Sequence, residues 1–368
     1  MGGRTYAETL LSELQRDDRG LHWVIGLSTD LVSELRRNSE NVNIRWLPFP
    51  KWSCSSVGRL IFEQVRLPTI IRALNPDVVY FSGNFLTLLS SKPSVLAIRS
   101  LLDYRHPEEV STPKRILRRA LTLAGTRMAT QIICPSDSIA QEVRDTFSVP
   151  EGRVRTVRHG TNFPYEVDPK DTLILDHLGV RDRPFFVYPA ALWGYKNHIT
   201  LIHAASRLHG GAREAAIIFA GRGVGVRGSH VAMLRREINK VPAPTRVILA
   251  GEVDPKQLCV LYTNAIATLF PSTYESFGNP IVESMAMGCP IVSSHSDALA
   301  EIVGNAGLLL DPLDVSAWAQ EMSKLANDSN YRERWSKKSA DSRGLYTPER
   351  AIDELASALL GAAGKSQN

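Results

Sequence analysis

The chain has 368 residues, of which 43% are hydrophobic and 22% charged, and this composition is typical of a globular protein long enough for two domains. No run approaches the ~18 uncharged apolar residues of a membrane-spanning helix, and the dispersed basic residues, without interleaved aromatic residues, argue against nucleic acid as a partner. The formal net charge of +5 suits an anionic substrate or membrane surface, although many soluble enzymes carry such an excess by chance.

Short apolar runs alternate with amphipathic stretches through the first half, which predicts a parallel sheet covered by helices. The expected strands are Trp23–Ser28, Val42–Leu47, Asp77–Phe81, Ser94–Ile98, Gln131–Cys134 and Val154–Arg158. The expected helices are Thr5–Gln15, Val57–Leu74, Pro113–Ala129 and Ser138–Phe147, the last of them capped by Ser136 and Asp137.

The start of the chain is unusual for such a domain. A helical pattern begins at residue 5, whereas a doubly wound domain ordinarily begins with a buried strand. Gly2-Gly3 looks like the glycine turn that follows a first strand, so we expect that a first strand is missing. The N-terminus also lacks a signal-peptide profile, and four scattered cysteines indicate reduced thiols, so we expect a cytoplasmic protein.

A polar, turn-rich stretch, 159–183, separates the two halves and is expected to be a linker. We therefore predict an N-terminal domain over 1–165, a C-terminal domain over 180–346, and a final helix and tail over 347–368. Strands of the second half are expected at Phe185–Tyr188, Ala216–Ala220, Arg246–Ala250, Asn264–Phe270, Pro290–Ser293 and Gly307–Leu310. Its helices are expected at Lys196–Leu208, Ser229–Lys240, Pro255–Tyr262, Pro280–Met287, Val315–Asn327 and, in the tail, Pro348–Leu360.

The strongest local motif runs from Pro271 to Gly288. A strand ends, a polar loop carries Glu275, and a helix that begins at Pro280 carries Glu283. The loop is thus expected at the carboxyl end of a parallel strand, where open α/β sheets bind ligands. Ionised carboxylates accept hydrogen bonds from the hydroxyls of a sugar or ribose. The alternative is a helix whose first turn merely carries a capping carboxylate.

This motif resembles the Glu-x7-Glu motif of the retaining glycosyltransferases of family 4. Its flanks, Pro-Ser, Phe-Gly-Asn-Pro and Met-Ala-Met-Gly-Cys-Pro, are similar to the family pattern. Further segments match in order along nearly the whole chain, including Gly2-Gly3, Ile132–Ala140, Val157–Asn162, Tyr188–His198, Gly251–Tyr262 and Asp311–Asp314.

The resemblance implies the GT-B fold, which is an α/β fold of two Rossmann-like domains facing across a cleft. It also implies that the C-terminal helix crosses back to the first domain. The implied activity moves a mannose-like or glucose-like hexose, with retention, from a nucleotide-diphosphate sugar to a glycan or lipid-linked acceptor in cell-surface polysaccharide synthesis.

Carried over residue by residue, the family pattern assigns Glu275 to the hydroxyls of the donor sugar and Glu283 to the ribose of the nucleotide. Lys196, in Trp193–Asn197, resembles the family's lysine on the donor diphosphate, where negative charge builds as the glycosidic bond breaks. We expect this lysine to be exposed, with little effect on stability. The remaining residues expected to bind the donor are Gly3, Ser276, Phe277, Gly278 and Asn279.

Two positions depart from the family pattern. The family's diphosphate arginine is absent from Ala190–Gly194, and Arg222, after strand Ala216–Ala220, is the candidate to replace it. Many members also have a His-Asp pair after the fourth strand, where this chain has Arg99-Ser100. Some relatives have arginine there, so Arg99 is a candidate catalytic residue.

Two other classes of function compete with a glycosyltransferase. Gly223–Gly228 fits G-x-G-x-x-G after a strand, and Glu252 follows the next strand at about the spacing of a ribose-binding acid, as in an NAD(P)-dependent oxidoreductase. However, these glycines start late after a strand that is not the first of its domain. The departures from the family pattern also leave open a sugar-nucleotide-binding protein without activity.

The sequence predicts neither a metal nor a cofactor. It contains no Asp-x-Asp, and its nine histidines form no pair at ligand spacing. We therefore expect side chains and helix dipoles to supply the positive charge for catalysis. The leaving diphosphate oxygen can take the acceptor proton, so no dedicated base is needed.

The acceptor is indicated only by a basic amphipathic helix, Lys114–Arg127. Its apolar side carries Ile116, Leu117, Ala120, Leu121 and Leu123. Such a helix can rest on anionic lipid as a peripheral contact at the inner face of the membrane and bring the site to a lipid-linked acceptor. The alternative is a domain helix whose apolar side faces the core.

Overall fold

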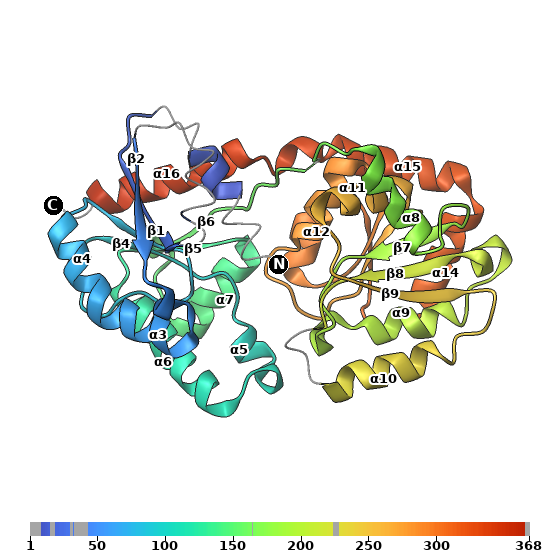
Figure 1. Cartoon of the computed structure of the whole chain (residues 1–368), viewed down its shortest axis with the longest axis horizontal. Coiled ribbons are helices and arrows are strands. Elements are labelled where there is room, and N and C mark those ends of the chain that lie inside the picture. Colours follow the sequence, from blue (N-terminus) through green and yellow to red (C-terminus); the bar gives the residue numbers. More distant parts are fainter. Residues whose placement is uncertain are drawn as a thin grey trace. The chain divides into compact units, whose positions relative to one another are not determined.

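The computed structural model describes residues 9–14, 19–29, 32, 43–163, 165–223 and 228–364. Their contacts divide into two compact units, which are described separately (Figure 1). Unit 1 comprises the described residues of Met1–Leu101, Thr112–Gly160 and Thr347–Asn368, and unit 2 comprises those of Leu102–Ser111 and Thr161–Tyr346. Gly2-Gly3, on which the expectation of a missing first strand rests, lies outside the described residues. Residues 224–227 of the segment Gly223–Gly228 also lie outside them.

Unit 1 contains two parallel sheets among its described residues. One pairs β1 (Trp23–Ser28) with β2 (Ile44–Phe49), and the other has the order β3-β4-β5-β6. The strands of the second sheet are β3 (Val79–Phe81), β4 (Ser94–Ala97), β5 (Gln131–Cys134) and β6 (Val154–Thr156). All six strands fall within the predicted segments or shift by two residues, because buried apolar runs between turns mark strands clearly.

The helices of unit 1 follow the predicted amphipathic stretches. They are residues 9–14, α3 (Ser56–Ile61), α4 (Leu67–Leu74), α6 (Thr112–Met128), α7 (Asp137–Phe147) and α16 (Pro348–Gly364). Ser136 caps α7 as predicted, because its hydroxyl accepts a hydrogen bond from the Ile139 N–H. The single helix predicted over 57–74 is wrong in detail, since a π-helical turn, Phe62–Arg66, separates α3 from α4. Pro68 cannot donate a backbone hydrogen bond, which favours such a distortion.

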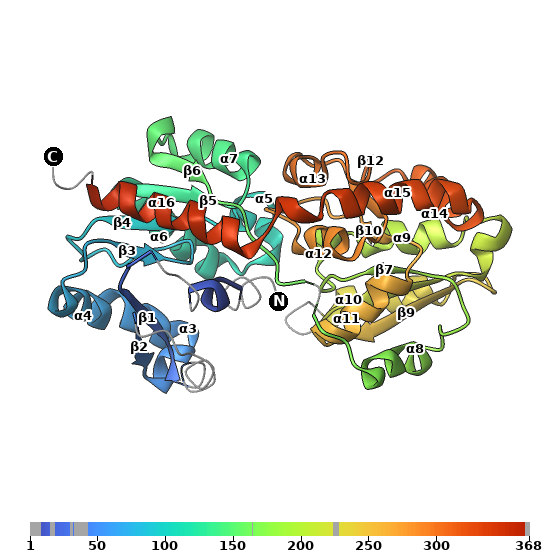
Figure 2. The same ribbon diagram turned by 90° about the horizontal axis from the view of Figure 1, so that it is seen from above.

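The last helix, α16, covers one face of the larger sheet of unit 1, and Figures 1 and 2 both show it along β4 and β5. Its Ile352, Leu355 and Leu359 pack in one apolar cluster with Val95 and Ile133 of those strands. The chain's C-terminal helix therefore belongs to the unit that contains the beginning of the chain. Burial of this apolar stripe stabilises the arrangement, at about 25 cal/mol for each Å² removed from water.

Unit 2 is built on a parallel sheet of six strands in the order β12-β11-β10-β7-β8-β9. The strands are β7 (Phe185–Tyr188), β8 (Ala216–Ala220), β9 (Arg246–Gly251), β10 (Thr268–Phe270), β11 (Ile291–Ser294) and β12 (Leu308–Leu310). The strand order changes direction between β10 and β7, which are neighbours in the sheet. Lys196 follows β7 and Glu275 follows β10, although the two residues are 79 positions apart in the chain. Such a switch point is where open α/β sheets bind ligands.

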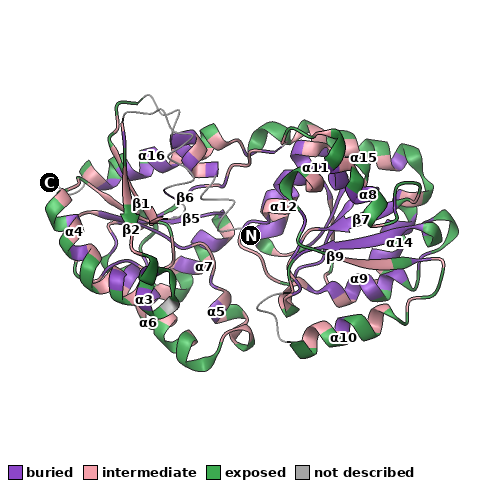
Figure 3. Cartoon of the chain, viewed as in Figure 1, coloured by how far each residue is buried: buried purple, intermediate pink, exposed green. Residues whose placement is uncertain are grey.

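Helices cover both faces of this sheet because alternate strand residues point to opposite sides. Phe186 and Tyr188 pack with the residues of α9, whereas Phe185 and Val187 pack with those of α8 and α11. Figure 3 shows this buried interior between more exposed outer helices. The helices are α5 (Leu102–Arg105), α8 (Leu173–His177), α9 (His198–Ala205), α10 (Gly228–Ile238), α11 (Pro255–Asn264), α12 (Asn279–Met287), α13 (Asp297–Val303), α14 (Val315–Asn327) and α15 (Ser329–Asp341).

Three predicted segments of unit 2 differ from the structure. The expected linker 159–183 contains α8, whose Ile174 and Leu175 are buried, so an apolar pair within a polar stretch is enough to anchor a short helix. The residues before Thr268 are not a strand, because α11 continues to Asn264. The helix expected from Lys196 begins instead at His198.

No helix in the described part of the chain combines the length and the apolar character needed to cross a bilayer. Cys134, Cys259 and Cys289 are free thiols that are buried in the core as small apolar residues.

Candidate active site

The Glu-x7-Glu segment forms a strand, a loop and a helix, as its sequence predicts. β10 ends at Phe270, and α12 begins at Asn279 with Gly278 as its N-cap. Gly278 has φ 86° and Gly288, at the other end, has φ 65°, so both ends use a left-handed conformation that glycine adopts without strain. A side chain at Gly278 would also clash with Leu299. The glycines therefore determine where the helix begins and ends.

Lys196 lies in a 3₁₀ turn rather than in an α-helix. The turn, Gly194–Lys196, follows β7, and Asn197 after it has a left-handed φ of 54°. Asn197 is held by its side-chain amide, which donates to the carbonyl oxygens of Pro271 (3.1 Å) and Pro312 (2.7 Å). The prediction that Lys196 opens a helix is wrong, because these side-chain bonds stabilise a turn that precedes the helix.

The ammonium group of Lys196 forms an ion pair with the carboxylate of Glu275. The two side chains are 14% and 11% exposed, so the expectation of a solvated lysine is also wrong. Tyr188 links the loops that carry Lys196 and Glu275. Its hydroxyl donates to the Lys196 carbonyl oxygen (2.8 Å) and lies 2.9 Å from the hydroxyl of Ser272. A cation and an acceptor thus lie side by side at the ends of neighbouring strands.

Glu283 lies inside unit 2 and is 7% exposed. Its carboxylate accepts a hydrogen bond of 2.8 Å from the Tyr262 hydroxyl, which also lies 3.3 Å from the carbonyl oxygen of Pro280. Burial raises the pKa of Glu283 to about 7, although the bond from Tyr262 opposes this shift. Glu283 therefore changes charge near neutral pH, unlike an ordinary surface glutamate.

The residues between the two glutamates differ in their surroundings. Phe277 is buried in the core, where its ring packs edge-on against Tyr346 at 5.6 Å. Gly278 is buried, and Ser276 and Asn279 are half-buried beside it. The side chain of Phe277 is thus committed to packing, which leaves its backbone as the part that can line a ligand site.

Arg222 follows β8 and forms an ion pair with Glu252, which follows β9. Both side chains are about half exposed, so this pair contributes little to stability. A Cβ on Gly221 would lie 1.9 Å from the Ala190 carbonyl oxygen, so only glycine permits this close approach of the loops after β7 and β8. Gly221 therefore places Arg222 next to the loop that leads to Lys196.

Arg99 belongs to unit 1 and follows β4. Its backbone N–H donates to the side-chain oxygen of Asn84 (3.0 Å), and the Asn84 amide donates to the Ser100 carbonyl oxygen (2.6 Å). Asn84 thus fixes the backbone on which Arg99 lies. The side chain of Arg99 is half-buried.

Helix α6 of unit 1 buries a different face from the one its leucines suggest. Thr122, Gly125 and Thr126 are its buried residues, and a Cβ on Gly125 would lie 3.0 Å from Leu96 of β4. Ile116 and Leu117, in contrast, are 63% and 44% exposed. The alternative of a domain helix whose apolar side faces the core does not hold for these two residues, because small residues bring another face of the helix close to the sheet.

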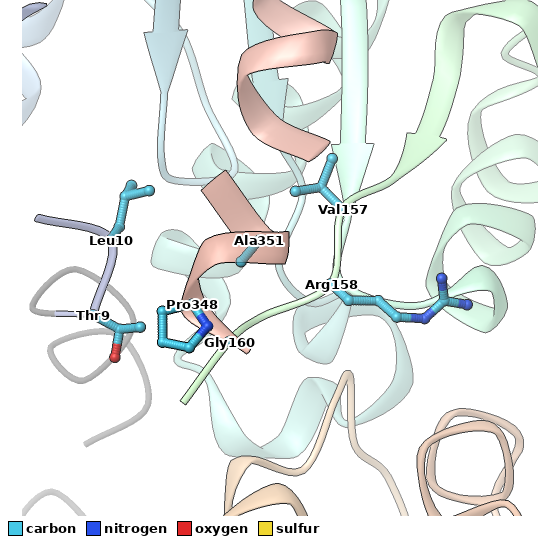
Figure 4. Close-up of a pocket in the computed structure, with 7 residues that line it drawn as sticks. All are labelled: Thr9, Leu10, Val157, Arg158, Gly160, Pro348 and Ala351. Carbon is cyan, nitrogen blue, oxygen red and sulfur yellow. The ribbon is translucent and has the colours of Figure 1, made fainter. Parts of the chain in front are cut away.

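A pocket in unit 1 is lined by backbone and mostly apolar side chains (Figure 4). It lies between the 9–14 helix, the segment after β6 and the start of α16, and its lining residues are Thr9, Leu10, Val157, Arg158, Gly160, Pro348 and Ala351. None of these is a predicted site residue. Within the described ranges, no three His, Cys, Asp or Glu side chains come together as metal ligands do.

Sequence reasoning missed three side chains that lie near the ion pair or Glu283. Tyr188 and Tyr262 look like ordinary apolar residues of a strand and a helix, and their hydroxyl partners are known only from the structure. His106 is the third, because its ring contacts Tyr195 and Tyr274. No local motif marks it.

Two family models match this chain in succession. The model described as Glycosyltransferase Family 4 matches residues 2–163, and the one described as Glycosyl transferases group 1 matches residues 172–342. Together with two parallel-sheet units and the strand–loop–helix segment, these matches define a glycosyltransferase of the GT-B class. The chain belongs to glycosyltransferase family 4, as its motifs predict. The oxidoreductase alternative has no support in these matches.

Relatives and solved structures agree with this assignment. The O-antigen chain mannosyltransferase B of Escherichia coli is 27% identical over 300 residues, which cover 76% of this chain and 77% of that protein. The O-antigen chain mannosyltransferase RfbU of Salmonella typhimurium is 19% identical over 296 residues, which cover 80% of this chain and 74% of that protein. The structure of Anabaena HepE has a TM-score of 0.75 at 18% identity over 98% of this chain and 96% of that one. The structure of WaaG has a TM-score of 0.68 at 15% identity, over 96% of this chain and 95% of that one. These likenesses confirm the predicted fold class.

Proposed function

We propose that this chain transfers a hexose, mannose-like or glucose-like, from a nucleotide-diphosphate sugar to a glycan or lipid-linked acceptor in polysaccharide synthesis. The observation that carries the proposal is the ion pair of Lys196 and Glu275 at the ends of two neighbouring parallel strands. The relatives named as O-antigen mannosyltransferases support a role in polysaccharide synthesis. HepE, which has the same fold, was solved with UDP and glucose, and this supports a nucleotide-sugar donor.

In this proposal the donor separates the ion pair. The donor diphosphate replaces the Glu275 carboxylate as the partner of the Lys196 ammonium, and Glu275 accepts hydrogen bonds from sugar hydroxyls. Glu283 accepts from the ribose, the backbone of Ser276–Asn279 lines the sugar site, and Arg222 adds positive charge near the diphosphate. Gly3 and Arg99 keep their proposed roles at the donor and the reaction centre. Without a donor, Lys196 and Glu275 are therefore paired with each other.

The proposed reaction retains the anomeric configuration and uses no divalent metal. The acceptor oxygen forms a bond to the anomeric carbon while the bond to the diphosphate oxygen breaks, and the electron pair leaves with the diphosphate. The acceptor proton passes to that leaving oxygen. Lys196 stabilises the developing negative charge, which is where a preorganised cation lowers the barrier most.

A contact of α6 with an anionic membrane is part of the same proposal. Ile116 and Leu117 are exposed, and Lys114 beside them is exposed and basic. Apolar side chains next to cationic ones suit an anionic bilayer surface. Such a contact would bring the protein to a lipid-linked acceptor.

The full-length chain incubated with GDP-mannose, UDP-glucose and other nucleotide sugars tests the proposal. We expect one donor to raise the melting temperature and to release its nucleoside diphosphate, with the sugar found by mass spectrometry on water or an added acceptor. A donor that binds without ever being consumed would indicate the inactive sugar-nucleotide-binding protein instead. No thermal shift with any nucleotide sugar would refute the proposal.

A further inference from the structure

A segment of unit 2 comes from an unexpected part of the chain. Residues Leu102–Ser111 lie in sequence between β4 and α6 of unit 1, yet their contacts assign them to unit 2. The segment contains α5 and a 3₁₀ turn, Pro107–Glu109, with His106 between them. The His106 N–H donates to the Leu102 carbonyl oxygen (2.8 Å), so the segment holds a defined local structure.

The imidazole of His106 contacts the rings of two tyrosines. The ring centroids lie 5.6 Å from Tyr195 and 5.9 Å from Tyr274, which is within the range of favourable aromatic contacts. Tyr195 directly precedes Lys196, and Tyr274 directly precedes Glu275. One ring therefore touches both loops that carry the ion pair, each on the residue before a charged partner.

Two carboxylates lie beside His106 and its segment. A carboxylate oxygen of Glu108 lies 2.9 Å from the Nδ1 atom of His106, but the Glu108 side chain is 59% exposed, so this contact contributes little. The carboxylate of Glu109 lies against the turn that carries Lys196, since a Cβ on Gly194 would be 2.7 Å from its oxygen. Burial, followed by the charges of Glu275 and Glu109, raises the pKa of the Tyr195 hydroxyl, so Tyr195 stays neutral.

We propose that His106 is a positioning residue, whose ring holds the loops after β7 and β10 together and so aligns Lys196 with Glu275 on the donor. This inference rests on the proposed function. The His106 side chain is 22% exposed and makes its contacts through the ring, so the effect depends on ring packing rather than on proton transfer. A misplacement of about 1 Å at such a site costs as much as 10²-fold in rate.

Three variants of the full-length chain test this inference. His106→Ala removes the ring, His106→Phe keeps a ring without its nitrogens, and His177→Ala is a matched control on α8, where the histidine is exposed. Backbone hydrogen exchange is measured over 190–197, 271–278 and, as a reference, β8. Turnover is measured with whichever of GDP-mannose and UDP-glucose the wild-type protein consumes.

We expect His106→Ala to exchange faster in both loops but not in β8, and to lose roughly tenfold or more in turnover with a smaller change in KM. His106→Phe and His177→Ala should resemble the wild type in both measurements. Unchanged loop exchange in His106→Ala would overturn the inference, as would faster exchange that includes β8. Equal loss of turnover in the Phe and Ala variants would also overturn it, because the nitrogens would then be required. If the wild type consumes no donor, the proposed function fails, while the exchange measurement still decides whether the ring holds the loops.

Discussion

Lys196 and Glu275 form an ion pair although 79 positions separate them in the chain. Each follows the end of a strand, and those strands, β7 and β10, are neighbours in the sheet. Parallel strands deliver their following loops to one edge, so the pair results directly from strand order.

The first prediction separates the catalytic and the structural effects of this pair. Lys196→Met should lower turnover by about 10²–10³, because it removes the cation at the developing charge. It should also destabilise the protein by about 1–3 kcal/mol, since the mostly buried Glu275 carboxylate loses its partner. Adding Glu275→Gln should restore the melting temperature but not the turnover. Wild-type turnover in the Lys196→Met variant would show that Lys196 does not stabilise the leaving diphosphate.

The second prediction concerns the buried carboxylate of Glu283. Between pH 4.5 and about 7 the folded protein keeps a proton on Glu283 that the unfolded chain has released, so stability falls as the pH rises through this range. Glu283→Gln escapes this loss, and it should melt at a higher temperature than the wild type at pH 8 and at a similar temperature near pH 4.5. Equal melting temperatures at pH 8 would contradict the raised pKa.

The same substitution should weaken nucleotide binding. A carboxylate-to-hydroxyl hydrogen bond contributes about 1.5–3 kcal/mol, which corresponds to one to two decades in affinity. Calorimetry with UDP and GDP should show this loss at pH 8. As the pH drops below about 7, where Glu283 gains a proton, the affinity of the wild type should fall more steeply than that of the variant, in which only the terminal phosphate of the nucleotide is protonated. An unchanged affinity at pH 8 would count against the ribose assignment.

The third prediction is that transfer needs no divalent metal. Lys196 and Arg222 supply positive charge on the loops after β7 and β8, so the leaving diphosphate has cationic partners in the chain itself. Turnover should be the same in EDTA as in buffer with magnesium or manganese. Activity that vanishes in EDTA and returns with either metal would refute this prediction.

The fourth prediction concerns α6. Replacing both Ile116 and Leu117 by Glu should reduce sedimentation with vesicles that contain anionic lipid, because apolar contact is lost and negative charge is added. Stability should change little, since both residues are exposed. Leu313→Glu, at a residue of unit 2 that is 69% exposed, is the control. Equal sedimentation of the wild type and the double variant would refute the proposed contact of α6 with the membrane.

Much of the architecture could be predicted from the sequence because local patterns encode it. The ranges of β1, β5, β7 and β8 coincide with the apolar runs between turns that predicted them. Pro280 and Gly288 mark the two ends of α12, since proline suits the first turn of a helix and glycine adopts a left-handed conformation at little cost. The family motifs then predicted the GT-B fold, because a shared order of motifs implies a shared order of strands.

The tertiary structure decided everything that depends on partners distant in the chain. No local pattern tells that Lys196 is paired with Glu275, that Tyr262 holds Glu283, or that His106 packs in the unit of Tyr195 rather than in that of its sequence neighbours. Charge state follows the same rule, since the pKa of Glu283 depends on burial by residues that its own helix does not contain. The sequence by itself therefore determined the elements and the family, whereas folding determined which side chains meet, because hydrogen bonds, ion pairs and desolvation act through space.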